Sequence, residues 1–576
     1  MNMFARHGFA AEHPNVVIVI TDDQGWGDLS LHGNENLRTP NIDGLAQAGA
    51  QFERFFVSPV CSPTRASLLT GRYHLRCGVT GVTRGGERMN LDEVTIAELF
   101  RSAGYATAAF GKWHNGSQYP YHPNGRGFDE FYGFCCGHWG SYFDPLLDHN
   151  GEEVQGSGFC IDDFTDHAMQ FIEANRDQPF LCYVAYNTPH SPMLVPDEFY
   201  DRALQRGVTM RHRDPEKEDP LMTIAAMAMC ENIDWNMGRL LKKLDELKLA
   251  EDTIIVYLSD NGPNSWRWNG EMKGRKGSVD EGGVRSPLFV RWPKRISPGR
   301  MVEPIASHID LLPTLVDLCD IDVSISPRQP KPMDGVSLKP LLLGEDVNWP
   351  DRAIFSTWGN KYSIRTQRYR ADAATLFDMQ SDPAQRENLA QRQPDLHRAL
   401  LARLNDWRKE MAADKPGDRA YPVGHPARGF TVLPAQDSEF QGKGLRFSAG
   451  PPNASWLTGW TAADAHVDWD IEVLTAGDYT VTVKYACADE AVGTKLAVTR
   501  GSRSVSAEIK EAFDPPLFPA PDRVKRIESY DKPFQRLSLG RLRLEAGRAP
   551  LVLTTPKLNG ESGIEIRQVE LRRVEP

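Results

Sequence analysis

The chain has 576 residues, which is too long for one ordinary domain. With 40% hydrophobic and 25% charged residues, it has the composition of a globular protein. Its formal net charge of −11 argues against nucleic acid or an anionic membrane as a partner, and no stretch approaches the length needed to span a membrane. Any site for an anion must therefore be built locally from basic side chains and a metal ion.

The start of the chain and its cysteines bear on the cellular compartment. Residues 1–14 contain no apolar core of signal-peptide length, so we expect a cytoplasmic protein. A periplasmic or secreted location would require a true start upstream. The nine cysteines follow no framework spacing, which predicts reduced thiols that are buried at Cys77, Cys182, Cys230, Cys319 and Cys487.

Short apolar runs alternate with helical patterns in the first half of the chain. The runs cover residues 15–20, 105–110, 180–185 and 253–258. A long helix is expected over residues 223–248, because Leu240, Leu241 and Leu244 give it an apolar face. This alternation predicts an α/β fold with a mostly parallel sheet flanked by helices, and we assign residues 14–349 to it.

The pattern changes near residue 350. Strands are expected at 353–357 and 361–365 and a helix over 384–411, which together predict a small antiparallel sheet subdomain over residues 350–411. Residues 412–430 are rich in proline, glycine and charge and are typical of a linker.

Residues 431–576 form a run of short alternating strands, which predicts an all-β sandwich of jelly-roll type. The texture is similar to that of carbohydrate-binding modules, so carbohydrate binding is one role for this accessory domain; capping an active site and forming a homo-oligomer contact are others. Its tryptophans Trp456, Trp460 and Trp469 favour a place in the core over stacking on sugar rings.

Polar residues follow the apolar runs at the points where the strands end. Asp22 and Asp23 follow the first run, and Asp260 and Asn261 follow the last. In open α/β sheets, ligands bind outside the carboxyl ends of the strands. Two adjacent carboxylates repel each other unless a cation neutralises them, and a set of oxygen ligands favours Ca²⁺ or Mg²⁺ over zinc.

The segment Cys61-Ser62-Pro63-Thr64-Arg65, followed by Thr70-Gly71-Arg72, is the most informative in the chain. Pro63 fits the first turn of a helix, which would place Cys61 at a helix N-terminus, where the backbone N–H groups favour an anion. By itself, the cysteine is also compatible with a reactive thiol or a plain buried residue.

The whole pattern resembles the signature of the Cys-type sulfatases of the alkaline phosphatase superfamily. This resemblance covers residues 14–411, including the small subdomain. It implies that a maturation enzyme oxidises Cys61 to formylglycine. It also implies a metal site, usually filled by Ca²⁺ and with Mg²⁺ less favoured, whose ligands are Asp22, Asp23, Cys61, Asp260 and Asn261.

Further segments match the family and imply catalytic roles. Lys112 and His114 lie in Gly111-Lys112-Trp113-His114, His190 lies in Thr188-Pro189-His190, and Lys276 precedes Gly277-Ser278, with Lys273 as the alternative lysine. One hydroxyl of the hydrated aldehyde would attack sulfur, while Arg65, Lys112 and Lys276 stabilise the sulfate charge. His190 would protonate the leaving alcohol, and His114 would take a proton from the second hydroxyl as sulfate leaves.

The resemblance predicts a sulfuric ester hydrolase acting on a sulfated carbohydrate or an aryl sulfate. Three alternatives stay open: a phosphate or phosphonate ester hydrolase on the same fold, a carbohydrate-binding protein with a dormant catalytic domain, and a zinc phosphatase. The alcohol side of the substrate is expected to contact loop residues, for which the candidates are His138, Trp139, Tyr142, Trp266, Trp268 and Trp358.

Overall fold

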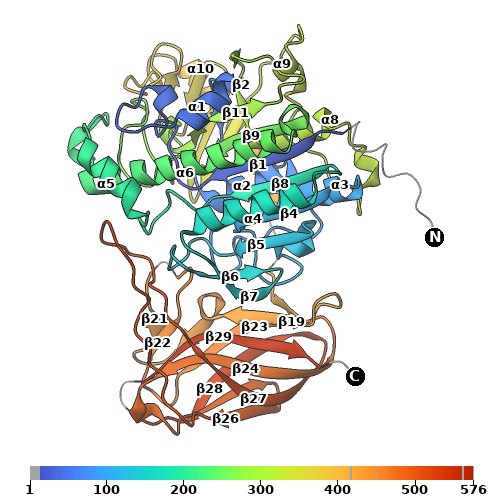
Figure 1. Ribbon diagram of the computed structural model, residues 1–576, viewed down its shortest axis with the longest axis vertical. Helices are drawn as coiled ribbons and strands as arrows, with labels where there is room; N and C mark the ends of the chain where they lie inside the picture. The colour runs from blue at the N-terminus through green and yellow to red at the C-terminus, as the bar shows by residue number, and fades with distance from the viewer. Residues whose placement is uncertain (1–12, 415–417, 451, 561–562, 575–576) are drawn as a thin grey trace.

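A ten-stranded mixed sheet lies at the centre of the amino-terminal part of the protein (Figure 1). The computed structural model describes residues 13–414, 418–450, 452–560 and 563–574. In spatial order the strands are β12 (Arg300–Val302), β2 (Ala50–Phe52), β11 (Leu288–Arg291), β9 (Thr253–Ser259), β1 (Asn15–Thr21), β8 (Phe180–Ala185), β4 (Ala106–Lys112), β5 (Glu130–Phe134), β6 (Leu146–His149) and β7 (Glu152–Gln155).

Four parallel strands form the middle of this sheet, in the order β9, β1, β8 and β4. They correspond to the four apolar runs of the sequence, and β1 is buried along its whole length. Parallel strands are covered on both faces, which explains why these runs are continuously apolar. The expected α/β class is therefore confirmed, with antiparallel strands added at both edges of the sheet.

Helices cover both faces of the sheet because successive side chains of a strand point to opposite sides. Val16, Ile18 and Ile20 pack in one hydrophobic cluster, whereas Val17 and Val19 pack in another. The first cluster includes side chains from α2 (Cys61–Thr70), α3 (Ile96–Ser102), α8 (Leu311–Leu318) and α9 (Lys339–Leu343). The second includes side chains from α1 (Pro40–Gln47), α4 (Cys160–Ala174), α5 (Asp197–Arg206) and α6 (Pro220–Glu246).

A small antiparallel sheet and one helix follow the large sheet in the chain. Their bounds are β14 (Ile354–Trp358), β15 (Lys361–Arg365), β16 (Tyr369–Ala371), β17 (Leu376–Asp378) and α10 (Pro394–Ala413). The helix expected from residue 384 begins only at Pro394, which occupies its first turn, where the missing N–H costs nothing. A second small sheet contains β10 (Arg285–Ser286), β3 (Phe55–Phe56) and β13 (Ala306–Ser307).

Two β-sheets form the carboxyl-terminal part and pack around one apolar core. One sheet has β18 (Tyr421–Val423), β23 (His466–Val473), β28 (Gly547–Lys557), β25 (Lys495–Arg500) and β26 (Arg503–Glu508), with β20 (Glu439–Gln441) beside β23. The other has β21 (Arg446–Phe447), β22 (Leu457–Trp460), β29 (Ile564–Arg573), β24 (Gly477–Cys487) and β27 (Gln535–Leu544), with β19 (Phe430–Pro434) beside β29.

The sandwich tryptophans Trp456, Trp460 and Trp469 are buried, so they do not form an exposed platform for sugars. Within the expected linker 412–430, β18 pairs with β23, whereas residues 415–417 lie outside the described residues. The domain boundaries drawn from the sequence at residues 349, 411 and 430 stay predictions.

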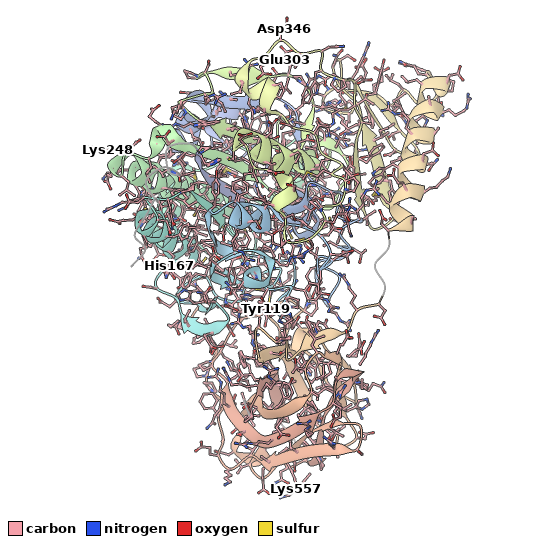
Figure 2. All side chains as sticks on the ribbon, turned by 90° about the vertical axis from the view of Figure 1, so that its right-hand side faces the viewer. Tyr119, His167, Lys248, Glu303, Asp346 and Lys557 are labelled. Atoms are coloured by element: carbon pink, nitrogen blue, oxygen red, sulfur yellow. The ribbon has the colours of Figure 1, made fainter. Side chains whose placement is uncertain are left out.

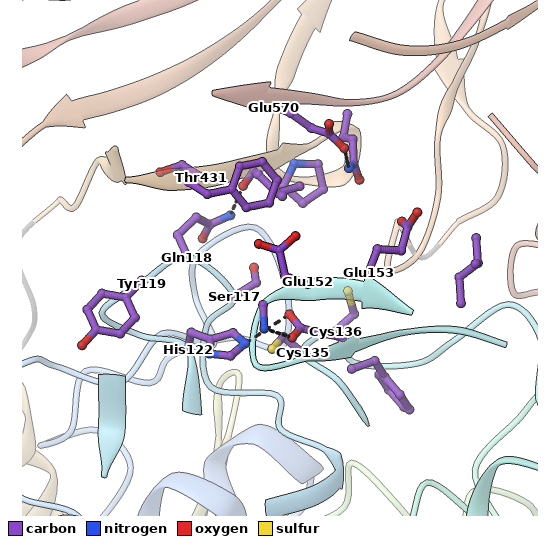
Figure 3. Close-up of a pocket in the computed structure, with 18 of the residues that line it drawn as sticks. Ser117, Gln118, Tyr119, His122, Cys135, Cys136, Glu152, Glu153, Thr431 and Glu570 are labelled. Atoms are coloured by element: carbon purple, nitrogen blue, oxygen red, sulfur yellow. Dashed lines mark hydrogen bonds and ion pairs between the residues drawn. The ribbon is translucent and has the colours of Figure 1, made fainter. Parts of the chain in front are cut away.

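The sandwich contacts the β6–β7 hairpin of the large sheet. Figure 2 shows Tyr119 at the junction of the two parts and Lys557 at the far end of the sandwich. Lys484 of β24 binds Glu153 of the hairpin at 2.7 Å. A cavity of about 470 Å³ lies at this junction, and Figure 3 shows Gln118 and Cys136 on one side of it and Thr431 and Glu570 on the other.

Two further properties concern the whole chain. The five cysteines expected to be buried thiols are buried and free. In the ranges that the structure describes, no helix combines the length and the apolar character that crossing a membrane requires. Residues 1–12 lie outside the described residues.

Candidate active site

The carboxyl ends of the four central strands bring the predicted polar residues together. Asp22 and Asp23 follow β1, Asp260 and Asn261 follow β9, and His190 lies in the segment after β8. The strand β4 ends at Lys112, and His114 follows two residues later. Because β9, β1, β8 and β4 are direct neighbours, these side chains meet at one edge of the sheet.

Cys61 is the first residue of α2, as expected, and its exposed fraction is 3%. The same helix carries Arg65, whose Nε and second terminal nitrogen lie 3.0 and 2.9 Å from Oδ2 of Asp260. The neighbouring Thr64 donates from Oγ1 to the Asp260 carbonyl at 2.6 Å. These contacts anchor the helix N-terminus, and with it Cys61, to the end of β9.

Three buried oxygen atoms at this edge have no hydrogen-bond partner in the described structure: Asp22 Oδ1, Asp23 Oδ2 and Asn261 Oδ1. Buried polar groups are rarely left unpaired, because desolvation without a partner is costly. Two groups of side chains with metal-binding atoms close together both include Asp22, one with Asp23 and His190 and the other with Cys61 and Asp260. Unpaired carboxylate and amide oxygens fit a hard divalent cation such as Ca²⁺.

Basic side chains surround these carboxylates. Lys112 Nζ lies 2.5 Å from Oδ2 of Asp22, and Lys276 Nζ lies 2.6 Å from Oδ1 of Asp23. Burial alone would raise the pKa of Asp22, but Lys112, followed by His190 and Arg65, holds that pKa well below its ordinary value. This carboxylate therefore stays ionised and available as a ligand.

Asp260 experiences the opposite balance. Burial, and then the Asp22 carboxylate, raise the pKa of Asp260 well above its ordinary value, and Arg65 only partly opposes this. A cation bound beside Asp260 would favour the ionised form of this carboxylate.

The two predicted histidines have different neighbours. Burial, and then Lys112, lower the pKa of His114 to about 3, and its Nε2 lies 2.7 Å from the Val82 carbonyl oxygen. His190 Nε2 lies 3.7 Å from Oδ2 of Asp23, and burial followed by Lys276 lowers the pKa of His190. The His114 ring is therefore held neutral, whereas the carboxylates of Asp23 and Asp22 oppose the lowering of the His190 pKa.

Asp23 and His114 also have unusual backbones. Their φ angles are 67° and 64°, in the left-handed region that non-glycine residues seldom adopt. Such a conformation costs on the order of 1–3 kcal/mol and often marks a functional site, because the surrounding structure must hold it.

The lysine segment and the expected substrate-contacting residues can now be placed. Lys276 reaches Asp23, whereas Lys273 binds Asp280 at 3.1 Å, so Lys276 is the lysine that faces the cluster. His138 stacks on His190 with ring centroids 6.1 Å apart, and the Tyr142 hydroxyl donates to the His190 carbonyl at 3.2 Å.

The tryptophans of the same set are more scattered. Trp139 lines the junction cavity instead, where it stacks on Phe134. Trp266 lines a cavity together with Lys276. Trp358 lies close to Gly277, and the guanidinium group of Arg211 lies over the ring of Trp268. His138 and Tyr142, by contrast, both contact His190.

Two side chains near the site were not anticipated from the sequence, and both come from the β-sandwich. Glu528 accepts a hydrogen bond from Ser191, the neighbour of His190. Asn453 lies next to Gly137 and His114. Their segments carry no motif, so no sequence signal pointed to them.

Comparisons with known proteins agree with this geometry. A protein-family model described as Sulfatase matches residues 14–321, and one described as N-sulphoglucosamine sulphohydrolase, C-terminal, matches residues 275–410. N-acetylgalactosamine-6-sulfatase of Canis lupus familiaris is 31% identical over 399 residues, which is 63% of this chain and 72% of that protein. Arylsulfatase A of Homo sapiens is 32% identical over 418 residues, which is 65% of this chain and 77% of that protein.

Among solved structures, that of Ps i-CgsB in complex with k-i-k-neocarrahexaose is similar, with a TM-score of 0.62 and 28% sequence identity. The match covers 69% of this chain and 92% of that one. The family match spans the strand ends, the Cys61 helix and the lysine segment described above. The chain therefore belongs to the sulfatase family of the alkaline phosphatase superfamily and is a sulfatase enzyme.

Proposed function

We propose that this sulfatase hydrolyses sulfate monoesters of carbohydrates through a formylglycine made from Cys61, with Ca²⁺ bound beside it. The observation that carries this proposal is the position of Cys61. It is the first residue of a helix that Arg65 anchors to Asp260, next to a cluster of carboxylates with unpaired buried oxygens.

The metal would be held by Asp22, Asp23, Asp260 and Asn261 together with residue 61. The unpaired oxygens of Asp22, Asp23 and Asn261 support this ligand set. When bound, a divalent cation lowers the pKa of a neighbouring hydroxyl and stabilises negative charge on the sulfate oxygens.

The basic side chains would then orient the sulfate group. Arg65, Lys112 and Lys276 all approach the carboxylate cluster from different elements. Held by carboxylates in a buried site, these groups are preorganised, so they can stabilise charge that develops as the ester bond breaks.

The histidines would move the protons. His190 would give a proton to the leaving alcohol oxygen. His114 would take a proton from the hydroxyl group that remains on residue 61, so that sulfate can leave. A neutral imidazole is required for the second task, and the low pKa of His114 supports it.

The burial of Cys61 constrains its maturation. With an exposed fraction of 3%, the thiol cannot enter the active site of another enzyme without local opening. We therefore propose that the formylglycine-generating partner acts on the chain before it has folded.

The substrate class rests on two observations. The relatives include an N-acetylgalactosamine-6-sulfatase and a protein in complex with k-i-k-neocarrahexaose. A cavity of about 620 Å³ beside the active site is lined by Trp266, by two aspartates and by seven basic residues, namely Arg213, Lys217, Lys273, Arg275, Lys276, Lys361 and Arg386. In a chain with a net charge of −11, such a lining favours an anionic oligosaccharide over an apolar alcohol.

The experiment is a comparison of initial rates on 4-methylumbelliferyl sulfate, 4-methylumbelliferyl phosphate and monosulfated sugars. We expect the sulfate esters to be turned over faster than the phosphate. Lys276→Ala should abolish most activity, whereas Lys273→Ala, its matched control, should retain most of it. Faster turnover of the phosphate would favour a phosphate ester hydrolase, and binding of sulfated sugars without turnover would favour a dormant catalytic domain.

A further inference from the structure

The segment 136–140, which follows β5, lies between the two candidate histidines and the β-sandwich. His138 stacks on His190. At Gly137, a Cβ atom would lie only 2.8 Å from Nε2 of His114. This segment therefore touches the side chains proposed to move both protons.

The β-sandwich holds this segment in place through several contacts. Gln436 Nε2 lies 3.1 Å from Sγ of Cys136, and Arg526 donates to the Gly140 carbonyl at 2.7 Å. Glu528 accepts from Ser191 beside His190, and Ser529 binds Ser448 at 2.8 Å. Two loops of the sandwich are thus joined to each other and to the active-site rim.

Asn453 is the sandwich residue that comes nearest to the chemistry. A Cβ atom on Gly137 would lie 2.7 Å from Nδ2 of Asn453 and 2.8 Å from Nε2 of His114, so both atoms lie against the same point. Asn453 has an exposed fraction of 7%.

Two buried imidazole nitrogens nearby are unpaired. His114 Nδ1 and His138 Nε2 have no partner among the described residues. Each imidazole therefore keeps one nitrogen free for a ligand, because Nε2 of His114 is bound to the Val82 carbonyl oxygen and its Nδ1 is not. Because unpaired buried polar groups are costly, they indicate a polar ligand that completes them.

We propose that the β-sandwich completes the leaving-group subsite of the enzyme, and that Asn453, together with His138, binds hydroxyl groups of the sugar that carries the sulfate. This inference rests on the proposed function. An amide both donates and accepts, so it suits the hydroxyls of a sugar ring. An aryl leaving group offers no such hydroxyls and would gain nothing from Asn453.

The first test is kinetic. We would compare wild type with Asn453→Ala on 4-methylumbelliferyl sulfate and on the best substrate from a panel of monosulfated galactose and N-acetylglucosamine isomers. Loss of a hydrogen bond to the sugar should lower kcat/KM on that sugar about tenfold. On the aryl sulfate, kcat/KM should stay unchanged. Gln441→Ala, which removes an exposed amide of the same sandwich, should alter neither.

Two results would overturn the proposal. An equal loss on both substrates would overturn the proposal, because it would mean that Asn453 only supports the domain junction. An unchanged rate on the sugar would also overturn it, because Asn453 would then lie outside the subsite.

A second measurement does not depend on turnover. The affinity of the same sulfated sugar for Cys61→Ala protein would be measured by calorimetry, with and without the Asn453→Ala change. We expect about tenfold weaker binding without Asn453. Equal affinities of the two proteins would overturn the proposed subsite. If Asn453→Ala weakens sugar binding but the wild type hydrolyses no sulfate ester, only the proposed function is refuted.

Discussion

Glu281 joins the lysine segment of the active site to the small antiparallel sheet, and its charge is expected to be essential for stability. It is the first residue of α7 (Glu281–Val284), and its exposed fraction is 1%. Its Oε2 lies 2.9 Å from a terminal nitrogen of Arg370 and 3.4 Å from Nε of Arg365, both of which are buried. Glu281→Gln keeps the shape of the side chain and removes the charge.

Two estimates of the cost agree. Burial alone would raise the pKa of Glu281, but Arg365 and Arg370 lower it from an ordinary value of 4.5 to about 2. At about 1.36 kcal/mol for each pKa unit, this corresponds to about 3 kcal/mol. Removing one partner of a buried ion pair costs about 3–5 kcal/mol in measured cases. Because the folded-state pKa is depressed, this stability is present above pH 4.5 and is lost as the pH falls towards 2.

The assay is thermal and urea unfolding at pH 7, followed by circular dichroism. Glu281→Gln should lower the free energy of unfolding by about 3 kcal/mol and the Tm by several degrees. Glu271→Gln is the matched control: Glu271 binds Arg386 at 2.9 Å, but its side chain is 48% exposed, so the loss should stay below about 1 kcal/mol. If Glu281→Gln proves no more destabilising than Glu271→Gln, the reasoning is refuted.

Three further predictions concern the metal, the pH dependence and the domain junction. Calcium at a free concentration one hundred times its Kd should stabilise the wild type by about 3 kcal/mol, so its removal by a chelator should lower the Tm. The Tm of Asp23→Asn should stay nearly unchanged, and equal responses of the two proteins would contradict the ligand set. Burial lowers the pKa of His74 to about 4 and that of His308 to about 3. The free energy of unfolding should therefore keep the full contribution of both histidines above pH 6.5 and decrease as the pH falls below it. This decrease should be less steep in His74→Gln. A slope unaffected by His74→Gln would contradict this assignment. Lys484→Met should strip Glu153 of a partner and lower the Tm, whereas Lys495→Met, on an exposed strand position, should not.

The strand ends and the Cys61 helix could be predicted because local rules determine them. The apolar runs of β1 and β9 end directly at carboxylates, and Pro63 marks a helix start. Once neighbouring parallel strands are assumed, Asp22 and Asp260 must meet at one sheet edge. The choice of Lys276 over Lys273 rested on the family resemblance alone, because which lysine reaches Asp23 depends on the path of a loop that Glu281 and its arginine partners hold.

The contribution of the β-sandwich was beyond prediction for a similar reason. Asn453 is separated from His114 by most of the chain, and only the docking of one folded part on another brings them together. The helix expected over 384–411 was placed too early, because its pattern does not distinguish the segment before Pro394 from the helix itself. Trp139 lines the cavity at the domain junction, whereas its neighbour His138 stacks on His190, and the sequence does not distinguish the directions of these two adjacent side chains.

The central claim is that residue 61 works as formylglycine. Trypsin should release residues 55–65 as one peptide, because Arg54 and Arg65 bound it. In active protein we expect mass spectrometry to find this peptide with an aldehyde at position 61. The aldehyde should form a hydrazone with a hydrazine reagent and should not react with iodoacetamide. Cys61→Ala protein should fold but show no turnover. The contradicting result would be a fully active preparation in which, after the assay and unfolding, iodoacetamide alkylates Cys61 completely.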